Sequence, residues 1–251
     1  MTSSVPKSVP QFYNQQWATV QGINDYNLFL IMFEPALQYS YSLLGQLRGK
    51  KLLEVGCGSG QQAVWFASQG SQVTAIDVSD KSVHSTQWAA KEHNVKLVAR
   101  RMDAAQLQFP AETFDLIYLN SVLMHVNHST VLKECARVLN PGGKIVIVEP
   151  LRSNPLLRIY RRFFSPYAKM NPQYLTLRQF QQFPAQVGFS GMEHREFSFL
   201  ALAALPFYHL FSDQRKARAL SSPLEKADTA LLKLVPLLHP WCWVTVVQYQ
   251  K

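Results

Sequence analysis

The stretch Lys50–Gly60, KKLLEVGCGSG, decides the fold that we expect for this chain. It begins with Leu52–Val55, which read as a short buried strand, and three alternating glycines follow. The next residues, 61–70, carry apolar side chains at helical spacing. Glycines let a backbone turn tightly and let a ligand approach it closely, and the first turn of a helix offers unpaired N–H groups. The stretch therefore predicts a strand, a glycine loop and a helix around a nucleotide-type pocket.

The spacing of the glycines indicates which ligand the loop binds. The run is E-x-G-x-G-x-G, with Glu54, Gly56, Gly58 and Gly60, whereas dinucleotide sites usually read G-x-G-x-x-G. The loop has no basic residue, and a carboxylate at the strand end suits a cationic ligand better than a phosphate. The stretch resembles motif I of the class I S-adenosylmethionine-dependent methyltransferases of the small-molecule type. That resemblance implies S-adenosylmethionine as the cofactor, bound by these residues and Cys57.

An acid ends the next predicted strand, Gln72–Asp77, QVTAID. It follows Glu54 by 23 residues, close to the roughly 20-residue offset expected for an acid that binds ribose hydroxyls. A carboxylate accepts two O–H bonds from the ribose diol. We therefore expect Asp77, with its neighbour Val78, to bind the ribose. The alternative is that Asp77 caps the following helix.

Two more strands end at polar residues that the resemblance assigns to the cofactor. A third strand is predicted at Lys96–Met102, followed by Asp103 and Ala104. In the family this acid bonds the adenine amino group, and Ala104 would place its N–H near the ring. A fourth strand at Phe114–Leu119 ends at Asn120, which the resemblance places beside the methionine part.

A helix and a fifth strand complete the predicted core. The helix, Val131–Leu139, is expected to stop at Asn140–Gly143 through a helix-ending glycine. The run LNPGG is similar to the LKPGG turn of the family. The strand, Lys144–Val148, is rich in β-branched residues and suits burial on both faces. This alternation predicts an α/β fold, a Rossmann-like doubly wound sheet that is mostly parallel.

The C-terminal part extends this sheet. A helix is predicted at Leu177–Val187 and a sixth strand from Gly188, and Trp241–Tyr249 fits the antiparallel last strand of similar proteins. We expect a single methyltransferase domain over residues 1–251. It consists of an N-terminal helical lid (1–48), a cofactor-binding core (49–150), and a helical substrate-lid insertion with the last two strands (151–251). In the lid, Tyr13 and Trp17 are candidate cation–π partners of the sulfonium, with ordinary helix packing as the alternative.

His125 is the candidate catalytic base, because it lies just beyond the fourth strand and an ordinary histidine pKa of about 6.5 suits proton transfer. The alternative is a histidine that holds its loop or touches the cofactor. His125, Glu149 and Tyr160 are candidate substrate-binding residues, and Glu149 alternatively holds the turn at Pro150. We expect no metal, because the chain has no His, Cys and carboxylate cluster. It also lacks the D/N-P-P-Y/F and Pro-Cys motifs of base-modifying enzymes.

The segment 152–169 is basic and amphipathic. It could rest on an anionic membrane surface, or it could be a substrate-lid helix with its apolar face buried. Its predicted apolar face is set against three arginines: Leu156, Leu157, Tyr160, Phe163 and Phe164 against Arg158, Arg161 and Arg162. The apolar segments Phe197–Leu210 and Leu231–Leu238 suggest a chamber for a lipophilic molecule, such as a phenol, a terpenoid or a quinone precursor.

Composition narrows the remaining classes. The formal net charge is +9, of which residues 1–150 contribute +1 and residues 151–251 contribute +8. The three cysteines show no paired or metal-like spacing and the N-terminus has no apolar signal core, which together favour a cytoplasmic protein. No apolar run is long enough to span a membrane.

We expect O-methylation of a small molecule, with C- or N-methylation open. The other classes considered are an RNA methyltransferase, a basic protein that keeps the fold without catalysis, and a nicotinamide-dependent oxidoreductase. The absence of base-targeting motifs counts against a nucleic-acid partner, and the glycine spacing counts against a nicotinamide.

Overall fold

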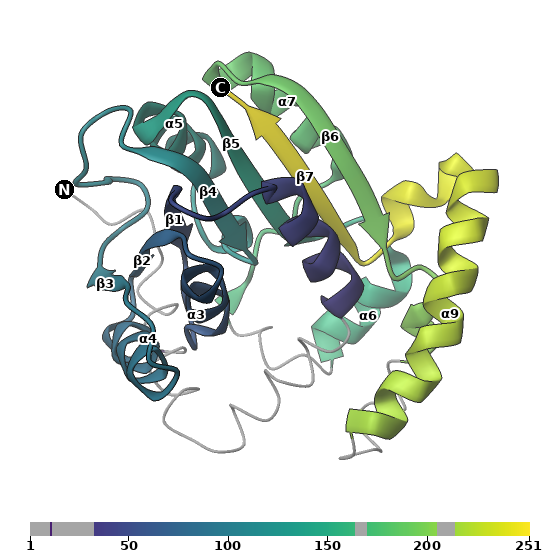
Figure 1. The fold of residues 1–251 in the computed structure, drawn as a ribbon. Helices are drawn as coiled ribbons and strands as arrows, with labels where there is room; N and C mark the ends of the chain where they lie inside the picture. Colours follow the sequence, from purple (N-terminus) through teal and green to yellow (C-terminus); the bar gives the residue numbers. More distant parts are fainter. Residues whose placement is uncertain (1–10, 12–32, 164–169, 205–213) are drawn as a thin grey trace.

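The computed structural model describes residues 11, 33–163, 170–204 and 214–251. Its centre is one seven-stranded sheet with the strand order β3-β2-β1-β4-β5-β7-β6 (Figure 1). The strands are β1 (Lys51–Val55), β2 (Gln72–Asp77), β3 (Val98–Arg101), β4 (Phe114–Asn120), β5 (Leu139–Pro150), β6 (Ser190–Phe197) and β7 (Val244–Gln250). The first five strands run parallel, so the predicted doubly wound sheet is confirmed.

β7 is the one strand of this sheet that runs antiparallel to all the others. It lies between β5 and β6 and pairs antiparallel with both. The predicted antiparallel last strand is therefore confirmed. Because β7 occupies an interior position, both of its faces are buried. Consecutive residues such as Val246 and Val247 point to opposite faces, and both are buried.

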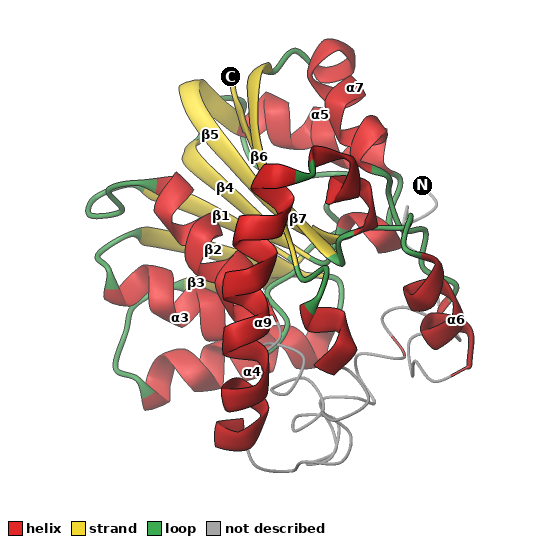
Figure 2. Ribbon diagram, turned by 90° about the vertical axis from the view of Figure 1, so that its right-hand side faces the viewer, coloured by secondary structure: helices red, strands yellow, loops and turns green. Residues whose placement is uncertain are grey.

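Helices cover both faces of the sheet (Figure 2). The helix at residues 33–44 and α3 (Gln61–Ser68) pack on one face, while α5 (His128–Val138) and α7 (Leu177–Val187) pack on the other. The remaining helices are α4 (Asp80–Glu92), η1 (Leu123–His125), α6 (Pro155–Phe163), η3 (Ala201–Ala204), α9 (Gln214–Leu234) and η4 (Pro236–Trp241). No helix in the described part of the chain is long and apolar enough to cross a membrane.

The helix α7 shows why some boundaries follow directly from the residues. Thr176 and Gln179 form a capping box at its start, and Gly188 ends it with a φ of 81°. Glycine adopts this left-handed conformation without steric cost. The predicted helix Leu177–Val187 is confirmed.

The predicted glycine stop of the preceding helix is wrong. α5 ends at Val138, its C-cap Leu139 is already extended, and β5 begins there. The side chain of Asn140 donates to Asp115 Oδ1 at 2.9 Å, which ties this segment to β4. A Cβ on Gly143 would lie 2.9 Å from the Asp115 carbonyl oxygen. The glycine is therefore needed for a close approach of two strands and does not end the helix.

Candidate functional site

The polar residues singled out in the sequence gather at one edge of the sheet. Because the carboxyl ends of parallel strands meet at the same edge, the ends of β1, β2, β3, β4 and β5 lie along one edge of the sheet. From β1 to β5 they contribute Glu54 and the glycine loop, Asp77, Asp103, Asn120 with His125, and Glu149. The site is thus built from five separate elements.

The glycine loop is packed against two neighbouring segments. Gly56 and Gly60 have φ angles of 78° and 82°, in the left-handed region. A Cβ would lie 2.4 Å from Val122 Cγ2 at Gly56 and 2.6 Å from Thr86 Cα at Gly60. Thr86 also donates its hydroxyl to the buried Cys57 Sγ at 3.2 Å. The loop therefore needs glycine for its own packing against η1 and α4.

Asp77 ties the loop to the end of β2. Its Oδ2 accepts the Gly58 N–H at 3.0 Å, and its Oδ1 accepts the Ser79 N–H at 2.9 Å. Burial raises the pKa of this carboxyl, although the N–H bonds oppose the shift. A carboxylate oxygen can accept more than one bond, so both oxygens keep capacity for a diol. The cap of α4 is Ser79, which accepts from the Ser82 N–H, so the alternative of Asp77 as the cap is wrong.

Glu54 adds a second acid to the same pocket. It is buried, its Oε2 has no hydrogen-bond partner among the described residues, and no described cation pairs with it or with Asp77. Burial and the nearby Asp77 charge raise the pKa of Glu54 well above its ordinary value. The Glu54 Oε2 atom has no donor in the described part of the chain, and the neighbouring Asp77 is also acidic, so the pair fits a ligand that carries a cationic group. The residues present therefore fit a cationic cofactor.

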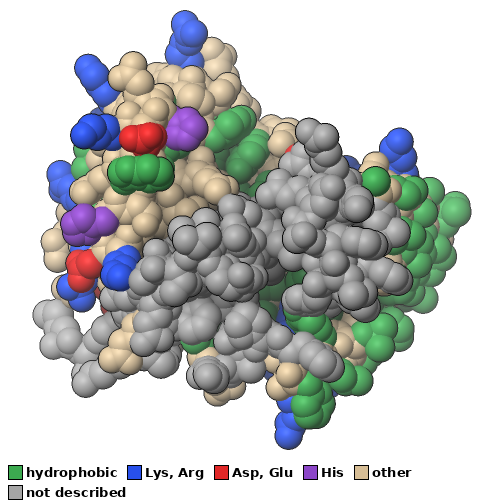
Figure 3. Space-filling view, turned by 90° about the horizontal axis from the view of Figure 1, so that it is seen from below, with side chains coloured by type: hydrophobic (Ala, Val, Ile, Leu, Met, Phe, Trp, Pro, Cys, Tyr) green, Lys and Arg blue, Asp and Glu red, His purple; other side chains and the backbone are tan. Residues whose placement is uncertain are grey.

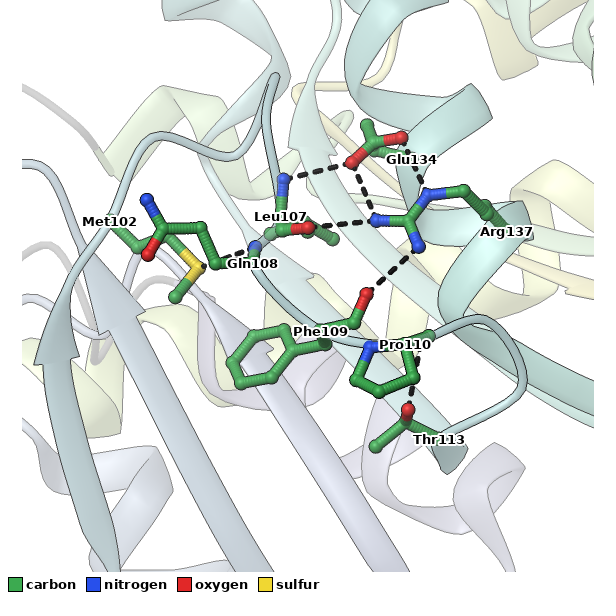
Figure 4. Close-up of polar contacts among 8 residues, drawn as sticks. All are labelled: Met102, Leu107, Gln108, Phe109, Pro110, Thr113, Glu134 and Arg137. Atoms are coloured by element: carbon green, nitrogen blue, oxygen red, sulfur yellow. Dashed lines mark hydrogen bonds and ion pairs between the residues drawn. The ribbon is translucent and has the colours of Figure 1, made fainter.

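The loop after β3 is held from outside the pocket. Asp103 Oδ1 accepts the Ala105 N–H at 2.9 Å, and Ala104 is buried. From α5, Glu134 accepts the Leu107 N–H at 2.8 Å. Arg137 donates to the carbonyl oxygens of Leu107 and Phe109, both at 2.8 Å (Figure 4). In the sequence, the i, i+3 spacing of Glu134 and Arg137 was the only signal for this pair, and it did not indicate that the two residues hold the loop.

His125 lies in η1, directly after the turn that ends β4. Ser121 turns the chain with a φ of 58° and donates its hydroxyl to Asn120 Oδ1 at 3.2 Å. His125 is only 9% exposed, and burial lowers its pKa to about 4. The expectation of an ordinary pKa is therefore wrong. The imidazole is neutral at pH 7, and it is a weak base.

Glu149 holds η1 in place. Its side chain is fully buried, and its Oε1 accepts the N–H groups of Val122 and Leu123, both at 2.6 Å. Its Oε2 has no partner among the described residues. Burial raises the pKa of this carboxyl to about 8. Glu149 thus positions the turn that carries His125 and keeps one oxygen for another group.

Arg161 lies beside the end of β5, and the sequence did not indicate it as a candidate site residue. Its guanidinium lies 3.7 Å from the centroid of the Tyr174 ring, and its Nη1 donates to the Leu151 carbonyl oxygen at 2.7 Å. Its Nη2 is buried without a partner among the described residues, and burial lowers the Arg161 pKa to about 10. The signal was its position four residues after Leu157, which is 1% exposed, because residues at i and i+4 share a helical face.

The predicted faces of α6 are therefore wrong in part. Leu157 and Arg161 point inward and Tyr160 is partly buried, whereas Leu156 and Phe163 are 70% and 68% exposed. The apolar residues do share one side of α6, but only the part of that side at Leu157 and Tyr160 packs inward, so their spacing could not decide which part is buried. Phe164 lies outside the described residues.

The predicted chamber is also wrong in part. In Leu231–Leu238, Leu232 is buried, but Leu234 and Leu237 are 81% and 87% exposed. Residues 205–210 of the other apolar segment lie outside the described residues, as do Tyr13 and Trp17.

A cavity of about 610 Å³ lies between the helix at 33–44, β6, α9 and η4. Beside it, buried Glu196 accepts from Thr245 Oγ1 at 3.0 Å and bonds the imidazoles of His194 and His239. None of the lining residues belongs to the glycine loop or to the ends of β2 and β3. This cavity is therefore distinct from the Glu54 and Asp77 pocket.

Comparison with known proteins agrees with this geometry. Residues 53–147 match the sequence family described as a methyltransferase domain. The chain is 35% identical over 121 residues to a ubiquinone biosynthesis O-methyltransferase of Alkalilimnicola ehrlichii, covering 47% of this chain and 49% of that protein. It is 32% identical over 137 residues to a demethylmenaquinone methyltransferase of Tropheryma whipplei, covering 54% of each. The chain thus spans about half the length of the curated relatives it matches.

The fold is similar to that of a solved structure as well. This is the Haemonchus contortus phosphoethanolamine N-methyltransferase 2 in complex with S-adenosyl-L-methionine, at a TM-score of 0.63 and 18% identity. The match covers 85% of this chain and 51% of that one. It supports the Rossmann-like fold of class I methyltransferases.

Proposed function

We infer, because residues 53–147 match a methyltransferase domain family, that this protein transfers a methyl group from S-adenosylmethionine to a small lipophilic acceptor. The observation that carries this inference is the pair of acids around the glycine loop, buried Glu54 and half-buried Asp77, which forms no ion pair with a cation among the residues that the structure describes. A pocket of that charge favours a sulfonium and an ammonium over the phosphates of a nicotinamide cofactor.

We propose that the edge of the sheet holds the cofactor in three parts. Asp77 binds the ribose diol with Val78 beside it, and Asp103 with Ala104 binds the adenine. Glu54 faces the cationic methionine part, with Gly56, Cys57, Gly58, Gly60 and Asn120 around it. The bound cofactor supplies the activated methyl group. The chain itself aligns the acceptor and excludes water, and alignment alone provides much of the rate enhancement in such displacements.

We propose O-methylation as the reaction. The relative from A. ehrlichii is named an O-methyltransferase, while C-methylation stays the alternative and N-methylation is open. Because burial lowers the pKa of His125 to about 4, its neutral imidazole is a poor acceptor for the proton of a phenol or a catechol. We therefore propose that His125 binds and orients the acceptor hydroxyl rather than removing its proton. Glu149 Oε2 and Arg161 Nη2 are buried groups without described partners, and we assign them to polar atoms of the acceptor, with Tyr160 beside them.

Substitution of Asp77 tests the cofactor assignment. Asp77→Asn keeps an acceptor for Ser79 but turns N–H groups toward Gly58 or the ribose. We expect S-adenosylmethionine to bind at least tenfold more weakly, measured by titration calorimetry. The matched control is Asp80→Asn, because Asp80 forms an exposed ion pair with Arg101 and lies outside the pocket. Unchanged affinity in Asp77→Asn contradicts the ribose assignment.

The acceptor class is tested with labelled cofactor. The protein is incubated with labelled S-adenosylmethionine and separate phenols, catechols, quinols, terpenoids, amines and bulk RNA. Label in an extractable phenol or quinol supports the proposal. Label in RNA, or reduction of a nicotinamide, contradicts it.

We also propose a cytoplasmic location and peripheral membrane contact through residues 152–169. Cys57, Cys135 and Cys242 are free and buried, which is typical of a reducing compartment. A lipophilic acceptor dissolves in lipid, so contact with a membrane would bring the enzyme to its substrate.

A further inference from the structure

Most of the exposed large apolar side chains of the described residues fall in two short segments. Seven of nine lie at 156–163 or 234–241, although these segments are far apart in the sequence. In α6 they are Leu156, Ile159 and Phe163, at 70%, 56% and 68% exposure. At the end of α9 and in η4 they include Leu234, Leu237 and Trp241, at 81%, 87% and 50%. Single exposed apolar residues need no explanation, but a gathered set of this size does.

The two segments are joined, and α6 is fixed from its inner side. Asn154 Nδ2 donates to the Trp241 carbonyl oxygen at 2.6 Å, and Asn154 Oδ1 accepts the N–H groups of Leu156 and Leu157 at the start of α6. Leu157 is buried, and Arg161 bonds inward to Leu151. These contacts fix the orientation of α6, so its outer apolar residues must face solvent. We call this surface, with the six residues above, the α6–η4 face.

Within the two segments that form the α6–η4 face, the Asp, Glu, Lys and Arg positions are all Lys or Arg. Arg152, Arg158, Arg162 and Lys233 are exposed beside it. Residues 150–192 and residues 229–251 contain no Asp or Glu. Seen from below, hydrophobic side chains gather at the right of the molecule, the side on which Figure 1 draws α6 and α9 (Figure 3).

We propose that the α6–η4 face is a membrane-docking surface for a bilayer that contains anionic lipid. Leucine, phenylalanine and tryptophan side chains enter the interfacial region, where tryptophan is favoured. The arginines and Lys233 meet the lipid phosphates, which attract basic residues near the surface. A second copy of the chain is a poorer occupant, because a symmetric contact would bring the same arginines against each other. The docking surface therefore includes η4 as well as residues 152–169, and it requires anionic lipid. Lipid binding by this surface does not depend on methyl transfer.

Flotation with vesicles tests the proposal. The full chain is mixed with vesicles of phosphatidylcholine, with or without about one third phosphatidylserine. We expect binding to the mixed vesicles that falls at least tenfold in Leu156→Ser/Phe163→Ser and in Leu237→Ser. We expect Arg158→Gln/Arg162→Gln to remove the preference for phosphatidylserine. The matched control is Trp88→Ser, because Trp88 is 66% exposed but lies in α4.

Several outcomes would overturn the proposal. They are wild-type binding in the Leu156→Ser/Phe163→Ser variant, equal loss in Trp88→Ser, or no preference for phosphatidylserine in the wild type. A stable dimer without lipid that dissociates in the Leu156→Ser/Phe163→Ser variant would assign the face to a second copy. Calorimetry with S-adenosylhomocysteine, run on each variant, separates this question from the proposed function. It tests the fold and the cofactor pocket alone.

Discussion

Gly60 and Gly142 share a left-handed conformation but differ in their surroundings. Their φ angles are 82° and 74°, yet a Cβ on Gly60 would lie 2.6 Å from Thr86 Cα, whereas a Cβ on Gly142 meets nothing within 4 Å. Gly142→Ala should therefore cost only the conformational penalty, about 1 kcal/mol. Gly60→Ala adds a backbone clash and should cost about 3 kcal/mol or more.

Urea unfolding of the two glycine variants measures the difference. Because the Gly60 clash moves the loop, cofactor affinity should also fall in Gly60→Ala and not in Gly142→Ala. Equal destabilisation would mean that the loop can shift away from α4 at little cost.

Glu149 predicts a pH dependence of stability. Burial raises its pKa from 4.5 to about 8, so between these values the folded state holds a proton that the unfolded state has lost. The Glu149 contribution is complete below pH 4.5 and is lost as the pH rises through 8. Glu149→Gln keeps an acceptor for the N–H groups of Val122 and Leu123, and it should flatten the decline of the unfolding midpoint between pH 5 and 8. Glu149→Ala leaves both N–H groups buried and unbonded, which costs about 1–3 kcal/mol for each.

Thermal unfolding across this pH range, for wild type and both Glu149 variants, checks these expectations. Parallel pH curves for wild type and Glu149→Gln would show that this carboxyl does not titrate there. A stable Glu149→Ala protein with weak acceptor binding would assign Glu149 to the substrate rather than to η1.

At the scale of elements, α5 holds the loop between β3 and β4 through Arg137. Its guanidinium contacts two carbonyl oxygens and Glu134 at once, a geometry that a lysine cannot reproduce. Arg137→Lys should cost about 1–3 kcal/mol, as expected for bonds to a charged donor. It should also speed amide exchange at residues 105–109. Arg101→Lys is the matched control, because its ion pair with Asp80 is more than half exposed and should contribute less than about 1 kcal/mol.

Hydrogen exchange read by mass spectrometry, together with urea unfolding, measures both effects. If Arg101→Lys and Arg137→Lys are equally mild, α5 does not control this loop.

The elements also show which features could be predicted from the sequence. The capping box of Thr176 and Gln179 with Gly188 fixes α7, because these signals are local. The orientation of α6 could not be predicted, since a bond from Asn154 to distant Trp241 and the stacking of Arg161 on Tyr174 decide it. Leu237 is exposed because α9 ends before Pro236 and η4 begins there. The apolar composition of this segment predicted burial instead.

At the scale of the whole molecule, the sheet and the positions of its polar ends could be predicted. β-branched runs separated by amphipathic helices dictate a parallel sheet, and a parallel sheet collects its strand ends at one edge. The electrostatics of the site could not be predicted. The low pKa of His125, the high pKa of Glu149 and the buried position of Arg161 all depend on how tightly η1, β5 and α6 close around them.

The interior position of β7 has a consequence for synthesis of the protein. The nascent chain makes β6 before β7, yet β7 is the strand that joins β6 to β5. Until β7 emerges from the ribosome, β5 has an open edge and β6 has no strand to pair with. Open edges of this kind recruit other chains. β7 therefore closes both strands at once, and a pause in translation between β6 and β7 would leave the chain most exposed to aggregation.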